Sequence, residues 1–161
     1  MSETEVEAVP AGFERLPEGF GFGDNLQPVY RRVEQERISL GLVVLEQHLN
    51  SMGICHGGVL MTLADMAAAS GVNQVRGVVA GSPTISLNMD FISSARRGEW
   101  LSAAAQQVSV KKRFGFCSGT IDNSRGLVAR FNGTFYFPDH EGMWKDEQSR
   151  ARLLGNLGAA E

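Results

Sequence analysis

The chain has 161 residues, enough for one domain with a hydrophobic core and too few for two ordinary domains. Its formal net charge of -3 argues against nucleic-acid binding, because neutralising phosphates requires a basic face. Two cysteines cannot build a disulfide framework, and neither an apolar leader nor a run of about 18 apolar residues appears, so we expect a cytoplasmic protein with no membrane partner.

Three segments follow one another along the chain. Residues 1–26 form a lead-in rich in Gly, Pro, Glu and Phe, and we expect Phe13, Phe20 and Phe22 to dock on the core. Residues 27–138 alternate between strand-like and helix-like patterns and form the expected domain. Residues 139–161 form a tail whose composition suits a short amphipathic helix.

The expected domain begins with a hairpin, because PVYRRV and RISLGLVVLEQ flank the polar EQE. A helix is predicted from Gly57 to about Asn73, where proline is absent and Ala, Leu and Met dominate. Many of its residues are small, which predicts a helix that is buried on most sides.

Four strand-like segments follow this helix: TISLNMDF, WLSAAAQQVSV, FGFCSGTIDN and LVARFNGTFYFP. In the first of them Thr84 shares the polar face with Ser86, Asn88 and Asp90. One helix cannot cover both faces of such a sheet, so the sheet must curl around the helix or pack against a partner. Both together describe an α+β hotdog fold, a curled antiparallel sheet of about five to six strands around one long helix, which usually dimerises.

The stretch HLNSMGICHGGVLMTLAD places two glycines at the start of the predicted helix. The first N–H groups of a helix lack internal acceptors, and glycine lets a ligand approach them, so this end suits a carbonyl oxygen. Asn50 can add a side-chain donor. The alternative is a tight turn that needs glycine for its geometry alone.

Asp65 lies nine residues after His56. That spacing corresponds to about 900° of rotation and about 13 Å of rise, so the two side chains should point away from each other. Two chains related by a two-fold axis can bring Asp65 of one opposite His56 of the other, which predicts an active site at a dimer interface. The alternative for Asp65 is a solvated acid, but its neighbours are mostly apolar, and a buried carboxylate is costly unless it is paired.

These residues form the pattern N-x-x-G-x-x-H-G-G, followed by an Asp nine residues after the His. The pattern resembles the hotdog acyl-CoA thioesterases of the phenylacetate-degradation type, the PaaI-like family. The resemblance covers roughly Leu40 to Pro138, including TISLNMDFISSARRGE and GLVARFNGTFYF.

The resemblance implies a role for each of these positions. Asp65 would activate water or attack the thioester, and the amide of Gly57 would polarise the carbonyl. Asn50 and His56 would orient the substrate or the water, and Thr84 would help to hold the water, although Thr84 equally suits an outward structural position. The substrate would be an acyl-CoA, with no separate cofactor, and the protein would be a homodimer or a dimer of dimers.

Two further features have both functional and plain interpretations. Lys112 and Arg113 lie in a basic turn and either contact the phosphates of coenzyme A or are ordinary solvated charges. Cys55 next to His56 suggests a nucleophile pair, but adjacent residues rarely point at each other and no third group orients them. His48, Cys55 and His56 lack the spacing of known metal ligands, so we expect no metal.

The predicted function is hydrolysis of a medium-chain or aromatic acyl-CoA, with apolar walls supplied by residues such as Met61, Met66, Met89 and Phe91. One alternative is a hotdog hydratase or dehydratase. The other is an acyl-CoA-binding protein without catalytic activity. The nine-residue spacing and the absence of proline in HGGVL favour the thioesterase.

Overall fold

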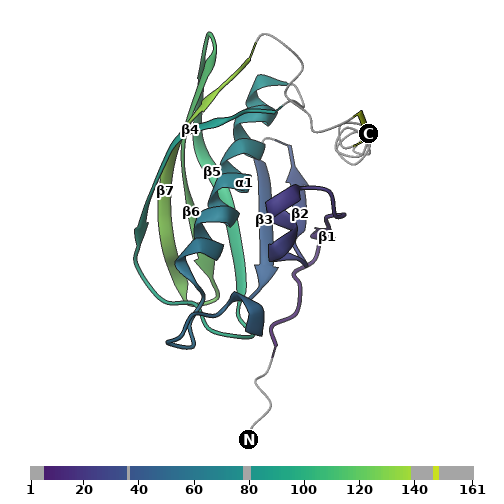
Figure 1. Cartoon of the computed structure of the whole chain (residues 1–161), viewed down its shortest axis with the longest axis vertical. Coiled ribbons are helices and arrows are strands. Elements are labelled where there is room, and N and C mark those ends of the chain that lie inside the picture. Colours follow the sequence, from purple (N-terminus) through teal and green to yellow (C-terminus); the bar gives the residue numbers. More distant parts are fainter. Residues whose placement is uncertain (1–5, 36, 78–80, 139–146, 149–161) are drawn as a thin grey trace, which may run out of the picture.

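The computed structural model describes residues 6–35, 37–77, 81–138 and 147–148. Its elements are β1 (Glu14–Arg15), η1 (Gly21–Leu26), β2 (Tyr30–Glu34), β3 (Arg37–Val43), η2 (Glu46–His48), α1 (Gly57–Arg76), β4 (Thr84–Phe91), β5 (Trp100–Lys111), β6 (Phe114–Asn123) and β7 (Gly126–Tyr136). The predicted hotdog fold is confirmed: the sheet curls around the single long helix (Figure 1). The predicted helical tail lies outside the described residues, apart from residues 147–148.

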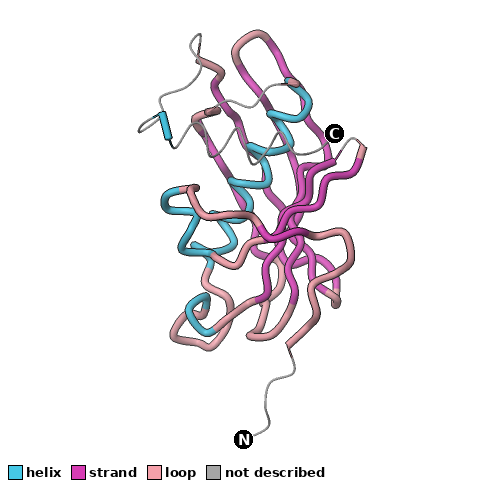
Figure 2. Tube along the Cα trace, turned by 90° about the vertical axis from the view of Figure 1, so that its right-hand side faces the viewer, coloured by secondary structure: helices cyan, strands magenta, loops and turns pink. Residues whose placement is uncertain are grey.

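The sheet has seven strands in the order β1-β2-β3-β5-β6-β7-β4, and every neighbouring pair is antiparallel. The expected five to six strands were too few, because the sequence pattern did not predict the two-residue β1 in the lead-in. Helices lie on one side of the sheet, and the other side is open (Figure 2). The sheet ends at β4, so one edge of this strand pairs with no other strand of the described residues.

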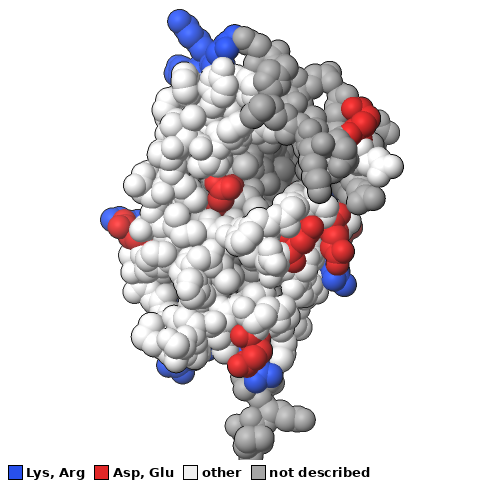
Figure 3. Space-filling view, viewed as in Figure 1, with Lys and Arg blue, Asp and Glu red and all other residues white. Residues whose placement is uncertain are grey.

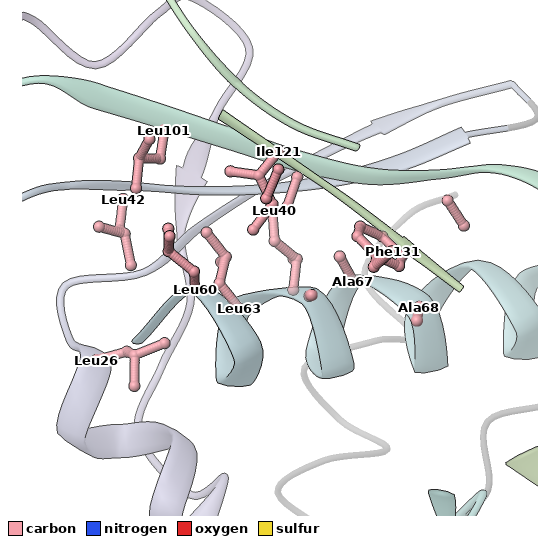
Figure 4. Close-up of a cluster of buried hydrophobic side chains, with 14 of the residues drawn as sticks. Leu26, Leu40, Leu42, Leu60, Leu63, Ala67, Ala68, Leu101, Ile121 and Phe131 are labelled. Carbon is pink, nitrogen blue, oxygen red and sulfur yellow. The ribbon is translucent and has the colours of Figure 1, made fainter. Parts of the chain in front are cut away.

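The core lies between α1 and the concave face of the sheet. Leucines and alanines of α1 meet leucines of β3 and β5 and larger side chains of β6 and β7 (Figure 4). The helix approaches β5 closely at Gly71, where an added Cβ would lie 2.6 Å from the Cβ of Ala105. The buried residues of α1 form one stripe, Leu60, Leu63, Ala64, Ala67, Ala68, Gly71 and Val72, and its other positions are half-buried or exposed, so the helix is not buried on most sides within this chain.

The lead-in is structured and packs on the domain. Phe20 packs against the core. Gly23 of η1 lies close to Met66, because a Cβ added at Gly23 would be 3.1 Å from the sulfur of Met66. Phe13 instead packs edge-on against Trp100, with ring centroids 5.0 Å apart. Phe22 is 74% exposed, so the expectation that it docks on the core was wrong: η1 turns its ring to solvent.

Candidate active site

Asp65 lies near the middle of α1 and is half-buried, on the side of the helix that faces β4. The hydroxyl of Thr84, the first residue of β4, donates a hydrogen bond of 2.7 Å to Oδ1 of Asp65. No hydrogen bond from a described residue reaches Oδ2 of this carboxylate. Asp65 therefore has one oxygen held in place and one open to a ligand.

A β-bulge explains why Thr84 reaches the helix. Thr84 pairs with Phe135 and Ser86 pairs with Thr134, so the register shifts at Ile85. Strict alternation would place Thr84 on the same face as Ser86, as the sequence pattern predicted. The bulge puts Thr84 instead on the side of the fully buried Phe135, which is the helix side. The outward orientation considered for Thr84 is therefore wrong, and its part in the reaction stays a prediction.

The start of α1 is capped by His56. Its Nδ1 accepts a 2.9 Å hydrogen bond from the N–H of Gly58, and its carbonyl accepts from Val59 and Leu60. Among the described residues, none accepts a hydrogen bond from the N–H of Gly57. The free N–H at this helix end can thus donate to an oxygen that develops negative charge.

Asn50 shapes the loop before the helix. Its Oδ1 accepts hydrogen bonds from the N–H of Met52 at 2.9 Å and of Ile54 at 3.3 Å. Gly53 completes the turn with a φ of 73°, in the left-handed region that residues other than glycine rarely adopt. The Nδ2 of Asn50 donates to no described residue, so this group is left to face a ligand.

An apolar wall stands beside the free N–H. An added Cβ at Gly57 would lie 3.3 Å from the ring of Phe91, and this ring is 55% exposed. Of the other residues expected in the acyl pocket, Met66 and Met89 pack against the core and Met61 is half-buried. In the view of Figure 3, charged groups lie mainly around the rim of the molecule, and one acidic group lies near the middle of a mostly uncharged surface.

Within one chain, the two halves of this candidate site are separate. Asp65 and Gly57 lie eight residues apart on one helix, which corresponds to about 12 Å along its axis. Asp65 is joined to the first residue of β4, and Gly57 contacts the last residue of β4. The structure therefore brings His56, Gly57 and Asn50 together at one end of the helix and leaves Asp65 and Thr84 farther along it.

The cysteines do not form a reactive site. Burial raises the pKa of the Cys55 thiol to about 12 and also raises that of Cys117, so both stay protonated near neutral pH. The described residues contain no group of His, Cys, Asp and Glu that could hold a metal ion.

Lys112 and Arg113 lie in the turn between β5 and β6, where Lys112 adopts a φ of 52°. This turn extends beyond the body of the sheet, and basic atoms gather at that end of the molecule (Figure 3). The guanidinium of Arg113 donates a hydrogen bond of 3.1 Å to the hydroxyl of Tyr136. The structure thus gives Arg113 a side-chain partner and places both cations at the surface.

Two features of the site had no usable signal in the sequence. The contact between Phe91 and Gly57 joins residues 34 positions apart. His48 is only 1% exposed and accepts the N–H of His56 at its backbone carbonyl. In the sequence, nothing distinguishes His48 from a solvent-exposed loop histidine, because its burial depends on tertiary contacts.

Comparisons with known proteins point to one family. The family whose model matches is the thioesterase superfamily, over residues 52–129. A protein of Pseudomonas aeruginosa named "Putative esterase" is 32% identical over 131 residues, which cover 81% of this chain and 98% of that protein.

Solved structures share the fold. A variant of the phenylacetic acid degradation protein PaaI from Thermus thermophilus has a TM-score of 0.65 at 27% identity, covering 73% of this chain and 99% of that chain. PaaI of Escherichia coli has a TM-score of 0.66 at 25% identity, covering 76% and 88%. Zebra fish thioesterase superfamily member 2 has a TM-score of 0.66 at 26% identity, covering 74% of this chain and 88% of that chain.

No helix among the described residues has the length and hydropathy needed to cross a bilayer.

Proposed function

Because this chain belongs to the thioesterase superfamily, with PaaI-like hotdog proteins among its relatives, and is thus a thioester hydrolase, we propose that it cleaves acyl-CoA in an active site shared by two subunits. One observation carries the proposal: the two ends of β4 contact the two halves of the site. Thr84 holds Asp65, and Phe91 contacts Gly57.

The exposed edge of β4 supports a two-fold dimer. Ile85 is 59% exposed and Phe91 is 55% exposed, and the one charge of the strand, Asp90, is paired with Arg130 at 2.7 Å. An open apolar edge of this kind favours pairing with another strand. If two copies of β4 pair antiparallel about a midpoint between residues 87 and 88, Thr84 lies opposite the partner's Phe91. Asp65 of one subunit would then face the partner's Gly57.

The chemistry follows from the free groups at each half. A water molecule bound to Oδ2 of Asp65 attacks the thioester carbon, and Asp65 accepts the proton that the water loses. The carbonyl oxygen becomes an oxyanion, which the N–H of Gly57 at the positive end of the partner's helix stabilises. The bond between carbon and sulfur then breaks, and coenzyme A leaves as a thiolate that takes up the proton. Thr84 orients Asp65 throughout, rather than holding the water itself.

His56 and Asn50 supply further donors beside Gly57. Since Nδ1 of His56 accepts from Gly58, a neutral ring carries its proton on Nε2, where it can donate to the substrate. The exposed rings and thioethers around this end favour a medium-chain or aromatic acyl group, because such groups gain from apolar burial.

A thiol-release assay over a panel of medium-chain and aromatic acyl-CoAs tests the proposal. We expect free coenzyme A from at least one of them, and Asp65→Asn should lower kcat by about 100-fold or more while the melting temperature stays near that of the wild type. Addition of water without release of thiol would indicate a hydratase, and binding alone would indicate a sensor. Wild-type kcat in Asp65→Asn would remove Asp65 from the mechanism.

For the coenzyme A phosphates we propose Lys112 and Arg113, because both lie at an exposed basic turn. The double variant Lys112→Gln/Arg113→Gln should raise KM for an acyl-CoA and leave kcat nearly unchanged, since phosphate contacts are made equally in the ground state and the transition state. Arg15→Gln, in β1 at one edge of the sheet and three strands away from the β5–β6 pair in the strand order, is the control. An unchanged KM in the double variant would assign the phosphates to other residues.

A further inference from the structure

His48 is buried but is not part of the chemistry proposed above. It is 1% exposed. Among the described residues, His48 and Ser39 are the two polar or charged residues that are buried. It ends η2 and lies eight residues before His56 in the chain. Burying an imidazole is costly unless its polar atoms serve a purpose.

The ring of His48 has a defined protonation pattern. Its Nδ1 accepts a 3.0 Å hydrogen bond from the N–H of Leu45, so Nδ1 carries no proton and Nε2 carries it. Within the part of the chain that the structure describes, Nε2 donates no hydrogen bond of ordinary geometry. Burial lowers the pKa of His48, and the nearby backbone groups of Leu26 and Val43 offset this effect only in part.

The backbone of His48 closes the loop that leads into α1. Its carbonyl accepts a 2.8 Å hydrogen bond from the N–H of His56, the residue that caps the helix. Within this loop, Leu49 and Cys55 form an isolated antiparallel β-bridge. The N–H of Asn50 donates a hydrogen bond of 2.8 Å to the carbonyl of Ile54. The orientation of His56, and with it the N–H of Gly57, therefore depends on where His48 is held.

We propose that His48 is a positioning residue for the proposed thioesterase site: its neutral ring, accepting from Leu45, fixes the Asn50–His56 loop and thereby aims the free N–H of Gly57. The catalytic role of the Gly57 N–H in this inference rests on the proposed function. The structural coupling between the ring of His48 and the backbone at Gly57 does not depend on the proposed function.

Protonation at Nδ1 would disrupt this arrangement. Nδ1 would then present a proton to the N–H of Leu45, and two donors cannot bond each other. The ionisable residues of the surrounding elements do not offset the new charge: Glu46 pairs with Arg97 at 3.3 Å, and Asp24 of η1 accepts from Gly19 and Phe20. Cys55 and His56 likewise form no hydrogen bond to this ring among the described contacts.

The direction of the pH effect follows from the lowered pKa. Below about pH 6.5, the ordinary value for histidine, the unfolded chain binds a proton at this position that the folded chain does not bind. The stabilising contribution of neutral His48 is therefore complete above that pH and is lost as the pH falls through it. In the folded protein, protonation occurs at a lower pH and should displace the loop.

Nitrogen-15 NMR of the wild-type protein without substrate tests the coupling directly. We expect one histidine with unprotonated Nδ1 and protonated Nε2 that titrates below the ordinary value, and the amide signals of Gly57 and Gly58 should shift with the same apparent pKa. Titration of His48 with no accompanying shift at Gly57 would overturn the proposal, and this readout is independent of whether acyl-CoA is hydrolysed.

Two variants separate the acceptor from the volume of the ring. His48→Asn keeps an acceptor for Leu45 and cannot titrate, whereas His48→Phe keeps the volume and loses the acceptor. In an acyl-CoA assay, His48→Phe should lower kcat by about 100-fold with little change in KM, because misplaced catalytic groups act on the chemical step. His48→Asn should retain most of kcat and lose the acid-side step that tracks His48 in the wild type. Wild-type kcat in His48→Phe, or the same acid-side step in His48→Asn, would contradict the proposal.

Discussion

Most polar side chains around the candidate site are already bonded to the protein. His56 accepts from Gly58, Asn50 accepts from its own loop, and Thr84 donates to Asp65. Among the described residues, Oδ2 of Asp65 and the N–H of Gly57 have no hydrogen-bond partner, as is also true of Nδ2 of Asn50. In the proposed mechanism, Oδ2 of Asp65 accepts the proton of the attacking water and the N–H of Gly57 donates to the oxyanion.

Thr84 gives a test at the scale of one hydroxyl. Thr84→Val keeps the shape of the side chain but removes the hydrogen bond to Asp65, which is worth about 1.5 kcal/mol for a charged acceptor. We expect kcat to fall about tenfold, with KM and the melting temperature nearly unchanged, in steady-state kinetics and thermal unfolding. Thr84→Ser keeps the hydroxyl and should stay near wild type; equal losses in both variants would show that the hydroxyl has no role.

The sequence pattern predicted which residues meet at the site better than it predicted their orientation. The motif from Asn50 to Asp65 placed the helix start and the acid correctly, because helical spacing is regular. Thr84 was placed on the wrong face, because a bulge depends on pairing with β7, which the local pattern does not contain. The burial of His48 likewise depends on tertiary contacts with the lead-in and β3.

At the scale of elements, the first turn of α1 determines whether the N–H at position 57 is available as a hydrogen-bond donor. His56 adopts a φ of -65° and a ψ of 136°, a conformation that a following proline accepts, and proline is favoured at the first helical position. Gly57→Pro should therefore leave α1 intact while removing the N–H at position 57.

We expect Gly57→Pro to reduce kcat by about 100-fold or more, measured by thiol release, as for loss of an oxyanion donor elsewhere. Gly57→Ala is the matched control, since it keeps the N–H and adds a Cβ that would lie 3.3 Å from the ring of Phe91, a side chain that is 55% exposed. If Gly57→Pro hydrolyses as fast as Gly57→Ala, the oxyanion must bind elsewhere.

The long elements could be predicted because each has a strong period. The helix and the strands after it were found near their observed bounds, since alternation and helical spacing persist over eight or more residues. The lead-in was harder, because β1 spans two residues and η1 spans six, too short for a period to show. The exposure of Phe22 follows from how η1 docks on α1, which composition does not reveal.

At the scale of the whole molecule, the separation of Asp65 and Gly57 is the reason why the proposed mechanism uses two subunits. About 12 Å of helix separates the two groups, too far for both to reach one thioester from the same chain. The open edge of β4 carries a contact to each half at its two ends, so antiparallel pairing would complete two equivalent sites per dimer.

The most direct measurement is complementation between two inactive variants, Asp65→Asn and Gly57→Pro. When equal amounts are unfolded together and refolded, half of the dimers should be mixed, and in each mixed dimer one of two sites has neither substitution. If the site is shared between subunits, we therefore expect recovery of about a quarter of wild-type thiol release, whereas each variant refolded alone stays inactive. Mixed dimers that form, as shown by mass spectrometry of the native protein, without recovering activity would contradict it.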